Sequence, residues 1–169
     1  MRTLLVRALA TTGCLLAVAG CGDGKSTTND TTPAATEVLR YEATGGCLMM
    51  GPNCATYVVN SDGSVEIYRT GENTPAEVEG SIPAAEVTAF LDSVKDTDFE
   101  VLIAEVGPGT CNACVDGIDV IATLTFADGP VTLDSTVVNF DPNNDFFANL
   151  ERLMEDVRAV GELEIQQRG

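Results

Sequence analysis

Hydrophobic and polar residues alternate in several short runs of the first half of the chain, which predicts strands there. Residues 38–43 have strand-like composition with partial alternation, and Tyr57-Val58-Val59 precedes a polar stretch. The run that follows divides between two faces: Val65, Ile67 and Arg69 on one, Glu66, Tyr68 and Thr70 on the other. Because Asp-Gly tolerates positive φ, we predict a β-hairpin turning at Asp62-Gly63. A short edge strand around residues 77–79 is expected next.

A second hairpin is predicted further along the chain. Residues 120–126 alternate, and Asp128-Gly129-Pro130 separates them from the short apolar run 131–133. In the first of these strands, one face carries Val120, Ala122, Leu124 and Phe126, and the other carries Ile121, Thr123 and Thr125.

Two runs have helical spacing instead. One apolar stripe consists of Val87, Phe90, Leu91 and Val94. We expect it to pack on the sheet. Pro83 precedes the stripe and suits the first turn of a helix. A longer stripe follows Asp141-Pro142, which we interpret as an N-cap and a first helical residue: Phe146, Leu150, Leu153, Met154, Val157 and Val160. Residues 99–103 fit either a strand or a helical turn. The order strands, helix, strands, helix predicts an α+β fold, a small antiparallel sheet built from hairpins with two packed helices.

The N-terminal segment indicates export. Arg2 and Arg7 precede or flank an uncharged run that ends in Val18-Ala19-Gly20-Cys21, which resembles a bacterial lipobox. We expect residues 1–20 to be a lipoprotein signal peptide and Cys21 to be acylated, for example with palmitate. An ordinary signal peptide cut before Cys21 is the alternative.

The remaining domain boundaries follow from composition. Residues 21–36 lack large apolar side chains, so they form a flexible acylated tether. Residues 37–163 form a single α+β domain, and 164–169 form a disordered tail. The protein is then held in the cell envelope, on the extracytoplasmic side of a bacterial membrane.

Charge excludes several functions. The chain has 9 basic and 26 acidic residues and no His, a formal charge of −17. Loss of Arg2 and Arg7 with the signal peptide leaves 7 basic against 26 acidic residues, which is −19. Such a chain repels phosphate backbones, so nucleic acid is excluded as a partner. Without His, Ser-His-Asp and Cys-His catalysis are excluded as well.

Four cysteines of the expected domain are candidates for disulfides: Cys47, Cys54, Cys111 and Cys114. In an oxidising compartment an even number favours two bonds. We favour the local pairs Cys47–Cys54 and Cys111–Cys114, while crossed pairings between the two segments stay open. A redox-active pair at Cys111 and Cys114 is the more specific alternative. Reactive pairs of this kind lie at the start of a helix, and no helical stripe follows Cys114. A four-cysteine zinc site would need closer spacing in the first pair.

We expect no cofactor and no metal site. Asp141, Asn143 and Asp145 imitate the start of an EF-hand loop, but Phe146 and Arg152 stand where Gly and Glu are needed. Three more aspartates are candidates for loose Ca²⁺ binding, although turn formation explains each: Asp116, Asp119 and Asp128.

Several short motifs resemble an uncharacterised family of bacterial secreted or lipoprotein domains. They are Cys47, Cys54-Ala55-Thr56-Tyr57-Val58-Val59, Asp62-Gly63-Ser64-Val65 and Ile82-Pro83. These match a Cys-rich opening, a Tyr-containing strand, an Asp-Gly turn and an Ile-Pro helix start, in order over residues 38–160. The chain departs from the family in a longer gap between the first two cysteines and in Ala55, where Pro is usual. The resemblance implies the fold and no activity.

The order of elements is also loosely similar to that of emfourin-like protease inhibitors. Gly45-Gly46 and Asp98-Phe99 are further points of similarity. That similarity implies that the loop 45–55 enters a protease or another partner through Leu48, Met49 and Met50. Alternatively, these three side chains cover the end of the sheet.

We therefore predict a membrane-anchored interaction or binding domain that is not an enzyme, with protease inhibition as the more specific hypothesis. A protein is the expected partner, besides the membrane that holds the N-terminal lipid. The alternative is an enzyme, a thiol–disulfide oxidoreductase that uses Cys111 and Cys114.

Overall fold

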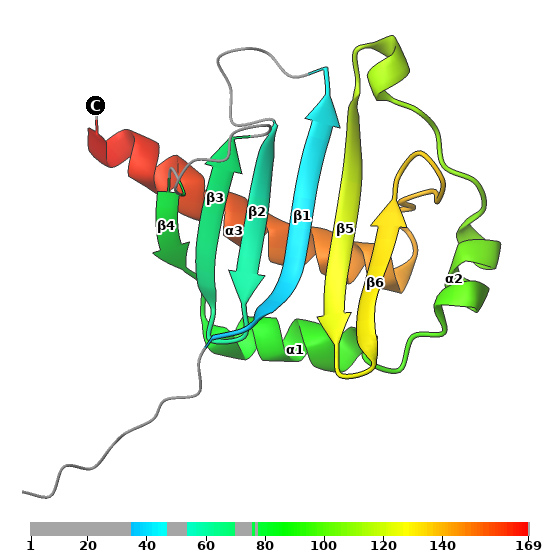
Figure 1. Cartoon of the computed structure of the whole chain (residues 1–169), viewed down its shortest axis with the longest axis horizontal. Coiled ribbons are helices and arrows are strands. Elements are labelled where there is room, and N and C mark those ends of the chain that lie inside the picture. The colour runs from blue at the N-terminus through cyan, green and yellow to red at the C-terminus, as the bar shows by residue number, and fades with distance from the viewer. Residues whose placement is uncertain (1–34, 47–53, 70–75, 77, 169) are drawn as a thin grey trace, which may run out of the picture. The chain divides into compact units, whose positions relative to one another are not determined.

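Six strands form one antiparallel sheet in the computed structural model, which describes residues 35–46, 54–69, 76 and 78–168. The order across the sheet is β4-β3-β2-β1-β5-β6 (Figure 1). The strand bounds are β1 (Glu37–Gly45), β2 (Ala55–Asn60), β3 (Ser64–Arg69), β4 (Val78–Ser81), β5 (Ile118–Phe126) and β6 (Gly129–Asp134). Together with the helices, this sheet confirms the predicted α+β class.

Both predicted hairpins are present, and β1 lies between them. Gly63, with a φ of +86°, closes the β2–β3 turn by donating its N–H to the Asn60 carbonyl at 2.9 Å. Gly129, with a φ of +125°, begins β6 after the turn at Ala127-Asp128. β1 pairs with β2 on one side and β5 on the other. The edges of the sheet are β4, a strand of 4 residues, and β6, which contains Pro130.

Among the residues that the structure describes, three α-helices and one 3-10 turn complete the fold: α1 (Ala84–Val94), α2 (Phe99–Val106), η1 (Ala113–Val115) and α3 (Asp145–Arg168). Pro83 is the residue directly before α1 rather than part of its first turn. The backbone of α3 continues through Arg168, past residue 163 where we expected the domain to end. Within the described ranges, none of the helices is long and apolar enough to cross a bilayer.

The predicted start of α3 is wrong by one turn. Asp141 does not cap the helix, because its carboxylate accepts the N–H of Asn143 at 2.9 Å in a local turn. Asn144 caps the helix instead, since its side-chain oxygen accepts the N–H of Phe146 at 3.0 Å. A short polar side chain that accepts an N–H from two residues further along the chain favours such turns, and it competes with helix capping at Asp141.

α2 settles the ambiguous run at 99–103 in favour of a helix. The Asp98 carboxylate accepts the N–H groups of Glu100 and Val101, which satisfies two of the free donors at the start of the helix. Leu102 of this helix is buried, and Phe99 and Val106 are partly buried against the core, so both the cap and this packing hold α2.

One face of the sheet carries the core and the other is open. In Figure 1, α1 and α3 lie behind the sheet. Leu39, Val59 and Leu124 face them and are completely buried. Gly80 lets α3 approach closely, because a Cβ there would lie 2.3 Å from a methyl group of Val160. Burying each large apolar side chain contributes roughly 1.5–3 kcal/mol, so this layer supplies most of the stability.

Candidate functional site

The sheet has two unlike ends. At the base end, β1 begins beside the β2–β3 turn, where Ser61 donates its N–H to the Thr36 carbonyl at 2.8 Å. At the loop end lie Gly45 and Gly46 with the segments 109–117 and 135–138 (Figure 1). Since β1 has 9 residues, the two ends are about 30 Å apart.

A disulfide joins Cys111 and Cys114 at the loop end, with Cα atoms 5.4 Å apart. The bond matches the local pairing that we favoured and excludes the crossed pairings of these two cysteines. Cys54 is also disulfide-bonded. Cys47 lies outside the described residues, as do Cys21 and the three apolar residues proposed for partner binding: Leu48, Met49 and Met50.

Asp119 holds the cysteine loop from within. Its side chain is only 6% exposed, and its two oxygens accept the N–H groups of Asn112 at 2.7 Å and Ala113 at 3.2 Å. In reactive dithiol sites such N–H groups stabilise a thiolate. Here the Asp119 carboxylate already accepts both N–H groups, and these bonds order the loop around the disulfide.

A backbone joint connects this loop to β1. Gly46 donates its N–H to the Gly117 carbonyl at 2.7 Å. A Cβ on Gly46 would lie 2.2 Å from the Asp116 carbonyl oxygen, and one on Gly45 would lie 2.5 Å from the Ala113 Cβ. Two glycines in succession thus allow the backbones to meet. The joint places the residue before Cys47 directly against the Cys111–Cys114 loop.

The loop end also exposes apolar side chains. Val115 is 79% exposed, and Val137 and Ile118 are 64% and 37% exposed. Val137 is tied to the same end because its carbonyl accepts the N–H of Gly109 at 3.0 Å. Single exposed apolar residues are common on proteins, and these three lie at the same end of the sheet.

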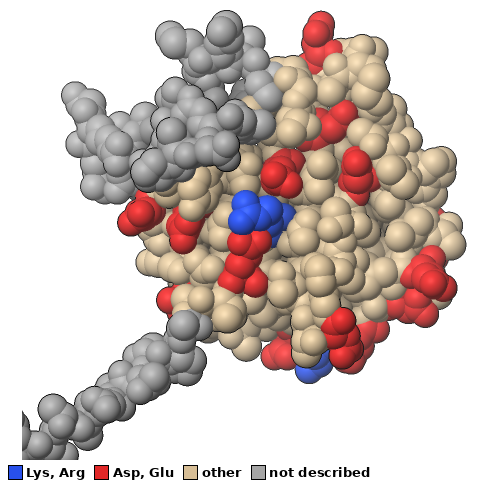
Figure 2. Space-filling model, in the orientation of Figure 1, with Lys and Arg blue, Asp and Glu red and all other residues tan. Residues whose placement is uncertain are grey.

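The open face of the sheet is polar. Figure 2 shows basic atoms in its middle beside acidic ones, with further acidic side chains towards its margins. Cross-strand register places Glu79, Glu66, Val58, Arg40 and Thr123 in one row across the face. Glu66 and Glu79 are direct cross-strand neighbours, a like-charge arrangement that slightly destabilises the edge.

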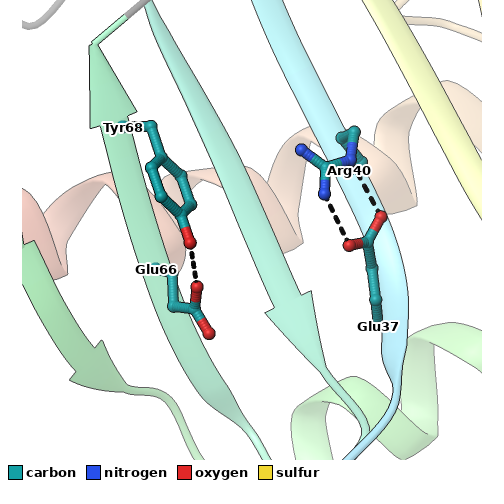
Figure 3. Close-up of polar contacts among 4 residues, drawn as sticks. All are labelled: Glu37, Arg40, Glu66 and Tyr68. Atoms are coloured by element: carbon teal, nitrogen blue, oxygen red, sulfur yellow. Dashed lines mark hydrogen bonds and ion pairs between the residues drawn. The ribbon is translucent and has the colours of Figure 1, made fainter. Parts of the chain in front are cut away.

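Two separate polar pairs occupy this face (Figure 3). Arg40 donates from Nε and Nη2 to the two oxygens of Glu37 at 2.9 and 2.7 Å, which raises the pKa of Arg40. The hydroxyl of Tyr68 donates to Glu66, and this bond raises the pKa of Tyr68. The carboxylates of Glu37 and Glu66 are therefore both hydrogen-bonded. They lie on β1 and β3, which β2 separates, and are not arranged as an acid–base pair.

On the helix side, Arg158 joins α3 to the sheet. It donates to Glu151 at 2.6 Å and to the Tyr41 hydroxyl at 3.4 Å, and its Cζ lies 5.7 Å from the centre of the Tyr41 ring. Burial raises the pKa of Tyr41, and the charge of Arg158 opposes that rise. A recess of about 170 Å³ lies beside this cluster, lined mainly by Tyr41, Phe140, Phe147 and Leu150.

A larger groove of about 330 Å³ runs between α1 and α3. Its floor is apolar, with Phe90 and Leu153 buried. Glu86 on α1 and Asp156 on α3 share a hydrogen bond at its side, and this bond raises the pKa of Glu86. Arg152 also lines the groove, but it donates to the Asn149 side chain at 3.0 Å.

The three aspartates that were candidates for Ca²⁺ are not brought together. Asp119 points into the cysteine loop, and Asp116 occupies a left-handed turn with a φ of +63°. Asp128 lies in the β5–β6 turn, at the other end of β5 from both. Among the described residues there is no group of three or more potential metal ligands.

Comparison with known proteins adds no assignment. No protein-family model matches the chain. No curated protein is significantly similar to it.

Sequence reasoning missed Glu86, Asp156 and the role of Asp119. Glu86 and Asp156 each stand directly before an apolar stripe residue, Val87 and Val157. That position at the border of a stripe could have marked both as residues flanking a helix contact. Nothing local shows that the two helices face each other. In the sequence, Asp119 is a residue type common in turns. Its burial becomes evident only in the structure, where the loop 111–117 folds over it.

Proposed function

We propose that this protein is a lipid-anchored extracytoplasmic binding domain that recognises a protein partner without catalysis of its own. The anchor is acylated Cys21, proposed from the lipobox-like sequence Val18-Ala19-Gly20-Cys21 and the basic, apolar segment before it. Residues 21–36 serve as its tether, with a reach of roughly 20 Å if they behave as a flexible chain.

The separation of the two ends of the sheet carries this proposal. The described chain begins at the base end, while the exposed Val115, Ile118 and Val137 lie at the loop end. A tether joined at the base end would leave the loop end about 30 Å further from the membrane. The disulfide and the buried Asp119 keep that end ordered, which lowers the entropy lost on binding.

Protease inhibition is the more specific form of the proposal. It rests on the loose similarity to emfourin-like inhibitors and on the sequence of the loop 45–55. The Gly46–Gly117 joint supports it, because it would brace one end of that loop against the cysteine loop. We also propose that the chain is related to the uncharacterised bacterial secreted domains that it resembles. That relationship would imply no activity.

The anchor is tested by replacing Cys21 with Ser in the full chain and expressing it in a bacterium that processes lipoproteins. We expect the wild type to be recovered in the membrane fraction with an N-terminal acyl mass and the variant to be released. A wild-type protein without acyl mass would contradict the anchor while leaving the binding proposal standing.

Binding is tested by introducing a photo-crosslinking amino acid in the cell at Val115 or at Asp128. Both positions are exposed turns flanking β5, at opposite ends. We expect a discrete crosslinked partner from position 115 and none from 128. Equal crosslinking from both, or none from either, would contradict recognition through the loop end.

A further inference from the structure

We infer that the groove between α1 and α3 binds a lysine or arginine side chain of a protein partner. This site lies in the helix layer, apart from the loop end, and it does not depend on the function proposed above.

The first observation is the approach of two acidic groups on different helices. Glu86 and Asp156 line the same groove and are close enough to share a hydrogen bond. Both are exposed acidic residues. They bring carboxyl groups from two helices to one groove, and a cation placed between them would be attracted by both.

The second observation is that the domain does not supply this cation itself. Arg152 lies in the groove but is bonded to Asn149 at 3.0 Å. Lys95, which follows α1, pairs with Asp92 at 3.1 Å. Within the described ranges, no ion pair joins a basic group to Glu86 or Asp156. The net charge of −17 also attracts basic partners rather than repelling them.

The third observation is the apolar floor, which favours a long basic side chain over a metal ion. Phe90 and Leu153 are 5% and 4% exposed and present apolar surface to the groove. Lys and Arg pack their methylene stems on such surface while the charged head reaches the carboxylates. Ca²⁺ would need about six to eight oxygen ligands, and two carboxylates supply no more than about four. A volume of about 330 Å³ also exceeds what one ion requires.

The test is a titration of the ¹⁵N-labelled intact chain, followed by amide shifts, with N-acetyl-Leu-Arg-amide as the probe. The matched probe N-acetyl-Leu-citrulline-amide has nearly the same shape and no charge. We expect the arginine probe to shift the amides of α1 and α3 around the groove and the citrulline probe to have little effect. Glu86→Gln and Asp156→Asn should each weaken binding by about fivefold or more, as expected for loss of a charge-assisted contact.

Glu155→Gln is the control, because Glu155 is an exposed neighbour of Asp156 that does not line the groove. Unchanged binding by this variant supports the site, whereas equal weakening would show only a general effect of net charge. Equal shifts with the citrulline probe, or no shifts at millimolar arginine probe, would overturn the proposal. CaCl₂ is titrated alone, and groove shifts with Ca²⁺ but not with the arginine probe would also overturn it.

Discussion

The base end and the loop end of the sheet are ordered by different means. At the base end, short turns and backbone bonds suffice: Gly63 accepts the N–H of Ile82 at 2.9 Å, and Asp62 holds the N–H and hydroxyl of Ser64. At the loop end, a disulfide and the buried carboxylate of Asp119 order the segment around the 3-10 turn η1. Tight turns with local hydrogen bonds therefore order the base end, whereas the loop end has in addition a disulfide and a buried carboxylate.

This difference has a functional meaning. Loops carry binding residues most often when a rigid scaffold positions them, and their backbone groups must then be satisfied by specific side chains. The loop end meets both conditions and exposes Val115 and Val137. The tight turns of the base end suit the attachment point that we propose for it.

The largest effect is expected from Gly63→Ala at the base end. Gly63 has a φ of +86°, and a Cβ there would lie 2.3 Å from the Ile82 carbonyl oxygen. Strain and displaced backbone together should cost about 2–4 kcal/mol in urea unfolding. Gly129→Ala is the matched control, with a φ of +125° and open space around the added methyl group. Equal losses in the two variants would mean that the contact with Ile82 contributes nothing.

Asp119→Ala should break the loop end while leaving the base end intact. The N–H groups of Asn112 and Ala113 lose a charged acceptor, which should cost about 1–3 kcal/mol. Amide exchange should accelerate across 111–117 and stay unchanged at Gly63. Acceleration spread over the whole sheet would show that the two ends are not independently ordered.

Removing the disulfide should have a smaller effect than removing Asp119. Cys111→Ser with Cys114→Ser opens a loop with a sequence separation of 3, and so short a loop contributes no more than about 2 kcal/mol. Unfolding by urea measures the loss. Val115→Ser, in the same turn with the bond intact, should leave stability unchanged because the side chain is 79% exposed. A larger loss than in Asp119→Ala would make the disulfide the main crosslink.

The smallest effect concerns Glu86, in the first turn of α1 next to the base end. Its pKa is raised by the bond to Asp156, so this contact stabilises most fully below the unfolded pKa of about 4.3. The stabilisation is lost as pH rises through the raised folded pKa. Glu86→Gln should therefore raise Tm slightly at pH 7 and give no gain near pH 4. Glu155→Gln provides the comparison, and an equal gain there would remove the special role of the pair.

Regular alternation made the sheet predictable. In β3 and β5 the period of two residues assigned each side chain to a face, and Gly63 and Gly129 marked turns that need positive φ. These signals are local, so the chain carries them without reference to its tertiary contacts. The stripe of α1 was predictable for the same reason.

The remaining features depend on residues distant in sequence or on competing local bonds. α2 exposes Val101 at 51% and Ile103 at 40%, so its apolar pattern does not distinguish helix from strand, and the Asp98 cap decides. At the start of α3, Asp141 and Asn144 are both suitable caps. Glu86 and Asp156 line one groove but belong to different helices. The apolar stripe of one helix does not show which other helix it packs against, so the groove could not be predicted.

The edges of the sheet have a further consequence if Cys21 is acylated. Copies held on a membrane diffuse in two dimensions, where their local concentration is high and exposed strand edges can pair between molecules. β4 offers only 4 residues, and Pro130 in β6 has no N–H to donate to a neighbouring strand. The short and interrupted edges thus disfavour edge-to-edge pairing between neighbouring copies.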